Sequence, residues 1–391
     1  MTAPLPAGVD GTCDERFAEI PRILAAQLES GEHHGAAIAV RHRGRPVVDI
    51  WGGPGWSEDT LAISFSTTKG ITATLAHMVL ERAGVSYDTK VASLWPEFGV
   101  KGKEDVTIRH LLCHEAGIPQ IKGEVDKVED LADWETMVGV MERLEPLWEP
   151  GTANGYHAVN FGWLVGEVIR RIDGRSFTDV LRDELVEPLG LDGLFIGTPE
   201  AEQHRIAPFA NDVGGGDGEI DLEAQIIKFL GPDHLLLRAL NPFGADVMGS
   251  FLASPLGQGS VGPSYTGAFT ARSLAIVYAA LERGGTLDGV RLMSPETVAA
   301  AATVQNKRPD LVLVVPVHWR MGFMGGGSAA SPAGPNREAF GHSGLGGSIA
   351  MADPKAELSV ALVLDRLEPN LLGDDRGRRV IDAAIAAATS S

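Results

Sequence analysis

The stretch ISFSTTKGIT, residues 63–72, decides how the rest of the chain is interpreted. It holds a serine, Ser66, and a lysine, Lys69, three residues apart. Residues at this spacing share one face of an α-helix and lie one turn from each other. Apolar residues continue at helical spacing up to Gly84, a residue typical of a helix end. We therefore predict a buried helix whose first turn carries both side chains.

The first turn of a helix suits a serine nucleophile. Its backbone N–H groups lack partners within the helix and carry the positive end of the dipole, so they favour an oxyanion. A lysine made neutral by burial can accept the hydroxyl proton of a serine one turn away. A capping serine beside a surface lysine would give the same spacing, however. A catalytic role for Ser66 and Lys69 therefore requires further evidence from the rest of the sequence.

Composition limits the classes of protein to which this chain can belong. Its 391 residues are enough for one large domain or two, and 44% hydrophobic with 22% charged residues is ordinary for a soluble globular protein. The net charge of −19 argues against nucleic acid and anionic membranes as partners. No signal peptide or bilayer-spanning apolar run is visible. Cys13 and Cys113 are read as free thiols in a reducing compartment, so we expect a cytoplasmic protein.

Strand patterns occur at both ends of the chain. Residues 36–41 with 46–51, and 348–353 with 358–364, read as antiparallel hairpins, 317–323 as a further strand, and 375–388 as a closing helix. We predict an α/β (α+β) protein whose antiparallel sheet is built from both termini, residues 1–84 and 301–391, and flanked by helices. Residues 85–300 form a mainly helical inserted subdomain. The glycine-rich stretch 212–218 does not open a helix after a strand, so we expect no phosphate-binding loop there.

Ser343 is the competing nucleophile. It lies in GHSGL, residues 341–345, which approaches the G-x-S-x-G elbow of an α/β-hydrolase. Leu345 stands where that pattern requires glycine, and a strand follows where the elbow needs a helix. Ser66 is therefore the better candidate.

Three further segments resemble the serine β-lactamase and penicillin-binding protein superfamily, specifically its class C-like, family VIII-type esterase branch. TIRHLLCHEAGI (residues 107–118) is similar to the family's R-H-L-L-x-H-x-x-G-[LI] segment. EPGTANGY (149–156) is similar to the P-G-x-x-x-x-Y stretch that presents its catalytic tyrosine, and GHSGLGGS (341–348) matches its K-T-G / H-x-G strand. The segments come in the family's order, and the resemblance covers nearly the whole chain. It implies the β-lactamase/transpeptidase-like fold.

The resemblance also implies that Ser66 attacks an acyl carbonyl and that Lys69 and Tyr156 share the proton transfers. A tyrosine between the lysine ammonium and the serine would have a stabilised phenolate and could act as a base near neutral pH. The oxyanion donors carried over are the backbone N–H groups of Ser66 and of Leu345, the residue after Gly344.

Two departures from the family pattern bear on the substrate. His342 replaces the lysine that opens the K-T-G strand, and Ala158 stands where lactam-hydrolysing members carry an asparagine. Both changes point to uncharged acyl esters. His114 is read as a structural hydrogen-bonding residue, while His157 either faces the cleft or packs. The spacing of the histidines and carboxylates matches no metal-binding pattern, so we expect neither a metal nor a cofactor.

Together these features predict a serine hydrolase that cleaves small carboxylic esters through an acyl-enzyme on Ser66. An amidase, D-peptidase or weak β-lactamase, and an acyltransferase on the same scaffold, are the enzymatic alternatives. The alternative outside enzymes is a catalytically silent member that binds a ligand. The sequence leaves open the natural substrate, the acyl chain length and the oligomeric state.

Overall fold

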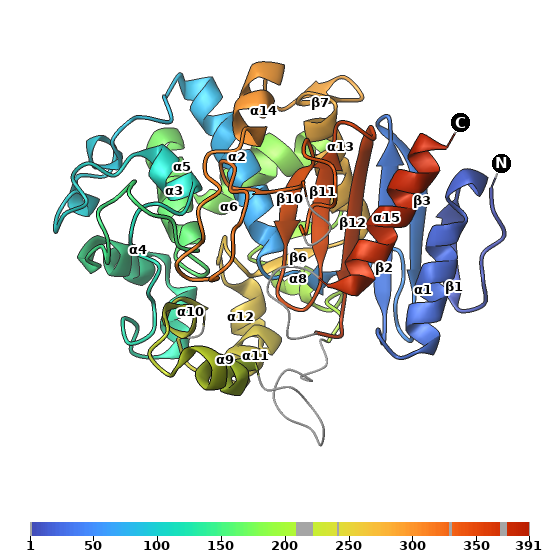
Figure 1. Cartoon of the computed structure of the whole chain (residues 1–391), viewed down its shortest axis with the longest axis horizontal. Coiled ribbons are helices and arrows are strands. Elements are labelled where there is room, and N and C mark those ends of the chain that lie inside the picture. The colour runs from blue at the N-terminus through green and yellow to red at the C-terminus, as the bar shows by residue number, and fades with distance from the viewer. Residues whose placement is uncertain (1, 209–221, 241, 328–330, 368–373, 391) are drawn as a thin grey trace.

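The computed structural model describes residues 2–208, 222–240, 242–327, 331–367 and 374–390. Within these ranges seven strands form one antiparallel sheet in the order β1-β3-β2-β12-β11-β10-β9 (Figure 1). N-terminal and C-terminal strands meet at the β2–β12 pair, so both ends of the chain build one sheet, as predicted. The glycine-rich stretch 212–218 lies outside the described residues. The strands are β1 (Val9–Cys13), β2 (Ala36–His42), β3 (Arg45–Gly52), β9 (Met324–Gly325), β10 (Phe340–Ser343), β11 (Ile349–Asp353) and β12 (Leu358–Leu364).

Helices cover both faces of this sheet (Figure 1). On one face pack α1 (Glu19–Glu29) and α15 (Asp375–Thr389), and on the other α2 (Thr67–Ala83) and α13 (Ala271–Glu282). β12 is buried on both sides, with its leucines toward α1 and α15 and the small Ser359 and Ala361 toward α13. Successive side chains of a strand point to opposite faces of the sheet, which separates the leucines from the small residues. The small residues allow α13 to pack close to β12.

Most of the regular elements in the described part of the segment between α2 and β9 are helices, but the segment also contains strands. Two of its strands, β6 (Gly267–Phe269) and β5 (Leu194–Ile196), form a small second sheet with β4 (Ala62–Ile63), which lies before α2; the order is β4-β6-β5. In the same segment β7 (Thr286–Leu287) pairs with β8 (Val290–Arg291). None of the helices in the described ranges has the length and apolar character needed to cross a membrane. The helices here are α3 (Ile108–Leu112), α4 (Trp134–Arg143), α5 (Phe161–Asp173), α6 (Phe177–Leu181), α7 (Glu187–Leu189), α8 (Glu200–Gln203), α9 (Leu222–Leu230), α10 (Leu235–Leu240), α11 (Ala245–Ala253), α12 (Pro255–Gly259) and α14 (Pro295–Ala302).

The three-part division of the chain stays a prediction. α13 falls within the segment 85–300 yet packs on β12, β2 and β11 of the main sheet.

The strand predicted over 317–323 is wrong. Trp319 N–H donates to Val317 O at 2.9 Å, and Arg320 N–H donates to Phe323 O at 2.9 Å. The backbone thus satisfies part of its hydrogen bonding through local turns instead of a ladder, and the strand starts only at β9.

α2 and α5 lie side by side and run in the same direction. Near their ends Arg82 of α2 pairs with Asp173 of α5. Near their starts Lys69 of α2 donates to Ala158 O, three residues before α5. Both helices therefore begin at the same place, where the candidate site lies.

Candidate active site

The turn before α2 fixes the position of Ser66. Phe65 has a φ of 45°, a left-handed conformation that non-glycine residues rarely adopt and that surrounding contacts must hold. Ser64 N–H donates to Gly267 O at 2.8 Å and so ties the turn to β6. Ser66 follows as the N-cap residue of the 17-residue α2, but its side chain makes no capping hydrogen bond. The half-buried hydroxyl is left for other partners, so the reading as a capping serine is wrong.

Lys69 lies fully buried with its amine against three oxygen atoms. Nζ is 3.1 Å from Ser66 Oγ, 2.6 Å from Ala158 O and 3.1 Å from Ser264 O. Burial lowers the pKa of Lys69 well below its usual range, because the charged form loses its hydration. The reading as a surface lysine is therefore wrong as well.

The two carbonyls that hold Lys69 were not anticipated from the sequence. Each belongs to the backbone, and neither Ala158 nor Ser264 carries a side chain that signals the contact. Ser264 is itself held in place, since its Oγ accepts the N–H of Gly162 at 2.6 Å. A Cβ at position 162 would lie 2.5 Å from Ser264 N, so glycine permits this approach between α5 and the loop before β6.

Tyr156 reaches the same place from the segment before α5. Its ring lies 4.9 Å from Lys69 Nζ and stacks against Trp319, with 5.5 Å between centroids and 16° between planes. The ring of His342 is also stacked with that of Tyr156, with 6.2 Å between centroids and 29° between planes. Burial raises the pKa of Tyr156 above its usual range, and a hydrogen bond with Ser66 only partly opposes this. These directions favour a neutral phenol rather than the phenolate expected from the sequence.

The end of β10 lies against the start of α2. Thr67 Oγ1 donates to Ser348 O at 3.2 Å, and Gly344 N–H donates to the same carbonyl at 2.7 Å. A Cβ at position 344 would lie only 2.1 Å from Ser64 O, so glycine is required for this contact. Within the described ranges, the N–H groups of Ser66 and of the half-buried Leu345 make no hydrogen bond. Both are available to a substrate oxygen.

His342 is a neutral, buried side chain. Its Nδ1–H donates to Ser343 O at 2.7 Å, so Nε2 carries the lone pair, and Nε2 has no hydrogen-bond partner among the described residues. Burial is the largest cause that lowers the pKa of His342, to about 3. Ser343 is fully buried, and its Oγ contacts Met324 Sδ at 3.8 Å. It therefore lacks the exposure and the base that a nucleophile needs.

His114 and His157 hold the segment that carries Tyr156. His157 Nδ1–H donates to Gly155 O at 2.7 Å, and its Nε2 accepts the N–H of Ile118 at 3.2 Å. His114 Nδ1 accepts the N–H of His157 at 3.2 Å. Burial lowers the pKa of both histidines, that of His157 to about 3. Both are neutral structural groups near pH 7, and of the two alternatives for His157 the structure shows packing.

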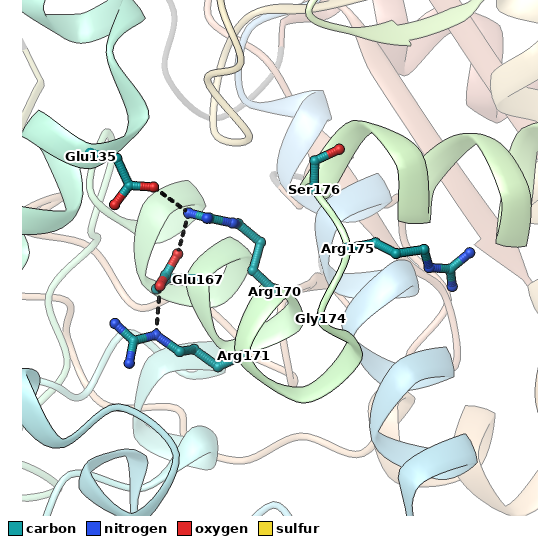
Figure 2. A pocket seen from close by; sticks show the side chains of 7 residues that line it. All are labelled: Glu135, Glu167, Arg170, Arg171, Gly174, Arg175 and Ser176. Atoms are coloured by element: carbon teal, nitrogen blue, oxygen red, sulfur yellow. Dashed lines mark hydrogen bonds and ion pairs between the residues drawn. The ribbon is translucent and has the colours of Figure 1, made fainter.

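A separate polar pocket of about 350 Å³ lies at the other end of α5 (Figure 2). Its arginines are paired with carboxylates: Arg170 contacts Glu135 and Glu167, and Arg171 Nε donates to Glu167 at 2.7 Å. On α5 the pocket lining starts at Glu167 and continues past the end of the helix, whereas Lys69 contacts Ala158 in the segment before α5. In the part of the chain that the structure describes, no three His, Cys, Asp or Glu side chains could hold a metal ion together.

A family model described as beta-lactamase matches residues 20–385. The chain belongs to the beta-lactamase family. Esterase/beta-lactamase LipL of Mycobacterium tuberculosis is 34% identical over 388 residues, which cover 94% of this chain and 86% of that protein. This relationship confirms the prediction of a serine hydrolase.

Solved structures agree with the family assignment. A family VIII carboxylesterase is 34% identical with a TM-score of 0.86, and the match covers 97% of this chain and 99% of that one. A penicillin-binding protein homolog from Caulobacter crescentus is 36% identical with a TM-score of 0.82 over the same shares. The predicted β-lactamase/transpeptidase-like fold is thereby confirmed.

Proposed function

We propose that the protein is a carboxylesterase that forms a covalent acyl-enzyme on Ser66. The observation that carries the proposal is the set of oxygen atoms around Lys69 Nζ. A neutral amine has two N–H donors and one lone pair. The carbonyls of Ala158 and Ser264 can only accept, so they engage the two N–H groups. The lone pair is then left for the hydroxyl of Ser66, which makes Lys69 the base in acylation.

The reaction follows from this arrangement. Ser66 Oγ bonds to the ester carbonyl carbon as its proton passes to Lys69 Nζ. The N–H groups of Ser66 and Leu345 stabilise the oxyanion, usually the largest single contribution to such catalysis. When the carbon–oxygen bond to the alcohol breaks, the leaving oxygen takes the phenolic proton of Tyr156. The Lys69 ammonium then returns a proton to the phenolate.

Deacylation uses the same groups with water in place of the alcohol. Water gives its proton to Lys69 as its oxygen adds to the acyl carbon. Ser66 Oγ then leaves and takes that proton back, which restores the free enzyme and releases the acid.

The site favours uncharged esters over lactam antibiotics. Such antibiotics carry a carboxylate that needs a cation, and His342 is neutral because its pKa is lowered to about 3. Ala158 offers its backbone carbonyl to Lys69 and has no side-chain amide for a lactam. A similar solved structure is called a family VIII carboxylesterase, which supports the ester, while the name of LipL, esterase/beta-lactamase, covers both kinds of substrate.

The test is covalent labelling of Ser66. Wild-type protein treated with a fluorophosphonate should gain one adduct, which peptide mass spectrometry should locate on Ser66, and it should hydrolyse p-nitrophenyl butyrate. Ser66→Ala should lose both properties while remaining folded. Ser343→Ala is the matched control, because it removes the competing buried serine and should keep both. Labelling of Ser343, or full turnover by Ser66→Ala, would overturn the assignment.

An acyltransferase would use the same acyl-enzyme and differ only in the acceptor. Adding a simple alcohol to the ester assay distinguishes the two, because transfer yields a new ester in place of the free acid. The convergence of Ser66, Lys69 and Tyr156 argues against a silent ligand-binding protein, which has no physical need for a buried lysine beside a serine.

A further inference from the structure

Asp310 is a buried carboxylate that the mechanism above does not use. It is 1% exposed and lies in the irregular segment before β9. A buried charge is costly unless hydrogen bonds replace its hydration, and this one has five of them. Asp310 Oδ1 accepts the backbone N–H groups of Tyr156 at 3.0 Å and of Val312 and Leu313 at 2.9 Å each.

The second carboxylate oxygen binds two side chains that also belong to the surroundings of Tyr156. Asp310 Oδ2 accepts Trp319 Nε1–H at 2.9 Å and Asn154 Nδ2–H at 3.1 Å. Trp319 is the ring that stacks on Tyr156, and Asn154 lies two residues before it. One carboxylate therefore fixes the backbone of Tyr156, the segment leading to it and the ring packed on it.

We propose that Asp310 is the positioning residue of Tyr156, and that through it the enzyme cleaves esters of aliphatic alcohols. This proposal rests on the carboxylesterase function. An alkoxide is a poor leaving group that must receive a proton as the bond breaks, so the phenol must be held where the leaving oxygen emerges. A p-nitrophenolate ion departs without that proton and depends much less on Tyr156.

The negative charge of Asp310 also favours the proton-donating form of Tyr156. It contributes to raising the pKa of Tyr156, after the larger effect of burial. A raised pKa keeps the phenol protonated across the working range, which is the state that can give a proton to the alkoxide.

The same chain provides a matched control. Asp353, at the end of β11, is also fully buried. Its Oδ1 accepts the N–H groups of Lys355 and Ala356 at 3.1 Å each, and its Oδ2 accepts Asn336 Nδ2–H at 2.6 Å. Asp353 thus repeats the local turn and the asparagine contact of Asp310, and within the described residues its side chain makes no hydrogen bond to Tyr156, Asn154 or Trp319.

The experiment compares two esters with the same acyl group, ethyl butyrate and p-nitrophenyl butyrate, by kcat/KM. Asp310→Asn keeps an oxygen for the backbone donors but turns an NH2 group toward Trp319 and Asn154. We expect a loss of about 10²-fold on the ethyl ester, the size of effect that a 1 Å misplacement produces. On the p-nitrophenyl ester we expect a loss of about tenfold or less, since its leaving group needs no proton. Asp353→Asn should change both esters by one common factor.

Equal losses on the two esters in Asp310→Asn would make its role merely structural and overturn the proposal. So would a wild-type enzyme that cleaves p-nitrophenyl butyrate but not ethyl butyrate. If Asp310→Asn does not fold, Trp319→Phe tests the same point, because it removes one donor to Asp310 and keeps the stacked ring. It should show a smaller loss with the same bias toward the ethyl ester. If wild-type protein cleaves neither ester, the carboxylesterase function itself fails, independently of Asp310.

Discussion

Gly344→Ala tests whether the contact between β10 and α2 positions the oxyanion donors. The added Cβ would lie 2.1 Å from Ser64 O and 3.2 Å from Thr67 Oγ1, and both neighbours belong to the tightly held turn that carries Ser66. Reaching the 3.4 Å of ordinary contact requires the two segments to separate by about 1.3 Å. A shift of this size moves Leu345 N–H away from Ser66 N–H.

The magnitude follows from what such donors contribute. Removing one oxyanion donor typically lowers kcat by about 10²–10³-fold, or roughly 2.7–4 kcal/mol, and a 1 Å misplacement lowers rates by about 10²-fold. We therefore expect Gly344→Ala to lower kcat for p-nitrophenyl butyrate by about 10²–10³-fold. KM should change much less, because the oxyanion forms only after the substrate has bound.

The assay is steady-state kinetics with thermal unfolding measured on the same preparation. Gly139→Ala in α4 is the control, since its Cβ would meet nothing within 4 Å. Replacing an unstrained helical glycine by alanine should raise stability by about 0.5–1 kcal/mol and leave kcat unchanged. If folded Gly344→Ala turns over within threefold of wild type, the β10–α2 contact does not position the donors and the reasoning fails.

Three further predictions concern the base, the substrate and acid stability. Lys69→Met should abolish ester turnover. Lys103→Met is the control and should keep it, because Lys103 is also a buried lysine that donates to two carbonyls and has its pKa lowered to about 8. Steady-state kinetics of the two variants, measured in parallel, test this prediction. Wild-type kcat/KM for p-nitrophenyl butyrate should exceed that for nitrocefin by at least about 10²-fold, or roughly 2.7 kcal/mol, and equal values would favour a lactamase. Burial, together with the charges of nearby arginines, lowers the pKa of His33 to about 3. Between pH 6.5, the ordinary pKa of histidine, and pH 3, His33 is therefore protonated in the unfolded chain but not in the folded protein. The free energy of unfolding should therefore fall as the pH drops from 6.5 toward 3, and His33 contributes up to about 1.4 kcal/mol of this fall per pH unit. Urea unfolding of His33→Gln should show a smaller decrease over the same pH range.

Much of the fold was predictable because its signals are local. The two hairpins and the closing helix have strong periodicity, and Gly84 ends α2 in a left-handed conformation with φ of 64°. β1 was not anticipated, because its sequence VDGTC has little strand character and is ordered by pairing with β3. The segment 317–323 looked like a strand by composition, but its residues are buried by tertiary packing rather than by a ladder.

The site was predictable only where side chains carry the chemistry. Ser66, Lys69 and Tyr156 were named from motifs, and the structure brings the three together. The carbonyls of Ala158 and Ser264 that contact Lys69 Nζ could not be predicted from the sequence, because any residue can supply a backbone oxygen. Asp310 lies more than 150 residues after Tyr156 in an irregular segment, so neither spacing nor periodicity links the two.

The central claim is that Lys69 is neutral and takes the proton of Ser66, and the pH dependence of Ser66 labelling tests it most directly. The second-order rate constant for fluorophosphonate modification of the wild-type protein can be followed by intact mass across the pH range. Lysine accepts a proton only above its pKa, and burial lowers that of Lys69 well below the ordinary 10.5. The rate should therefore reach a plateau at pH values well below 10.5. A rate that keeps rising tenfold per pH unit up to about 10.5 would show an ordinary, charged lysine and contradict the account.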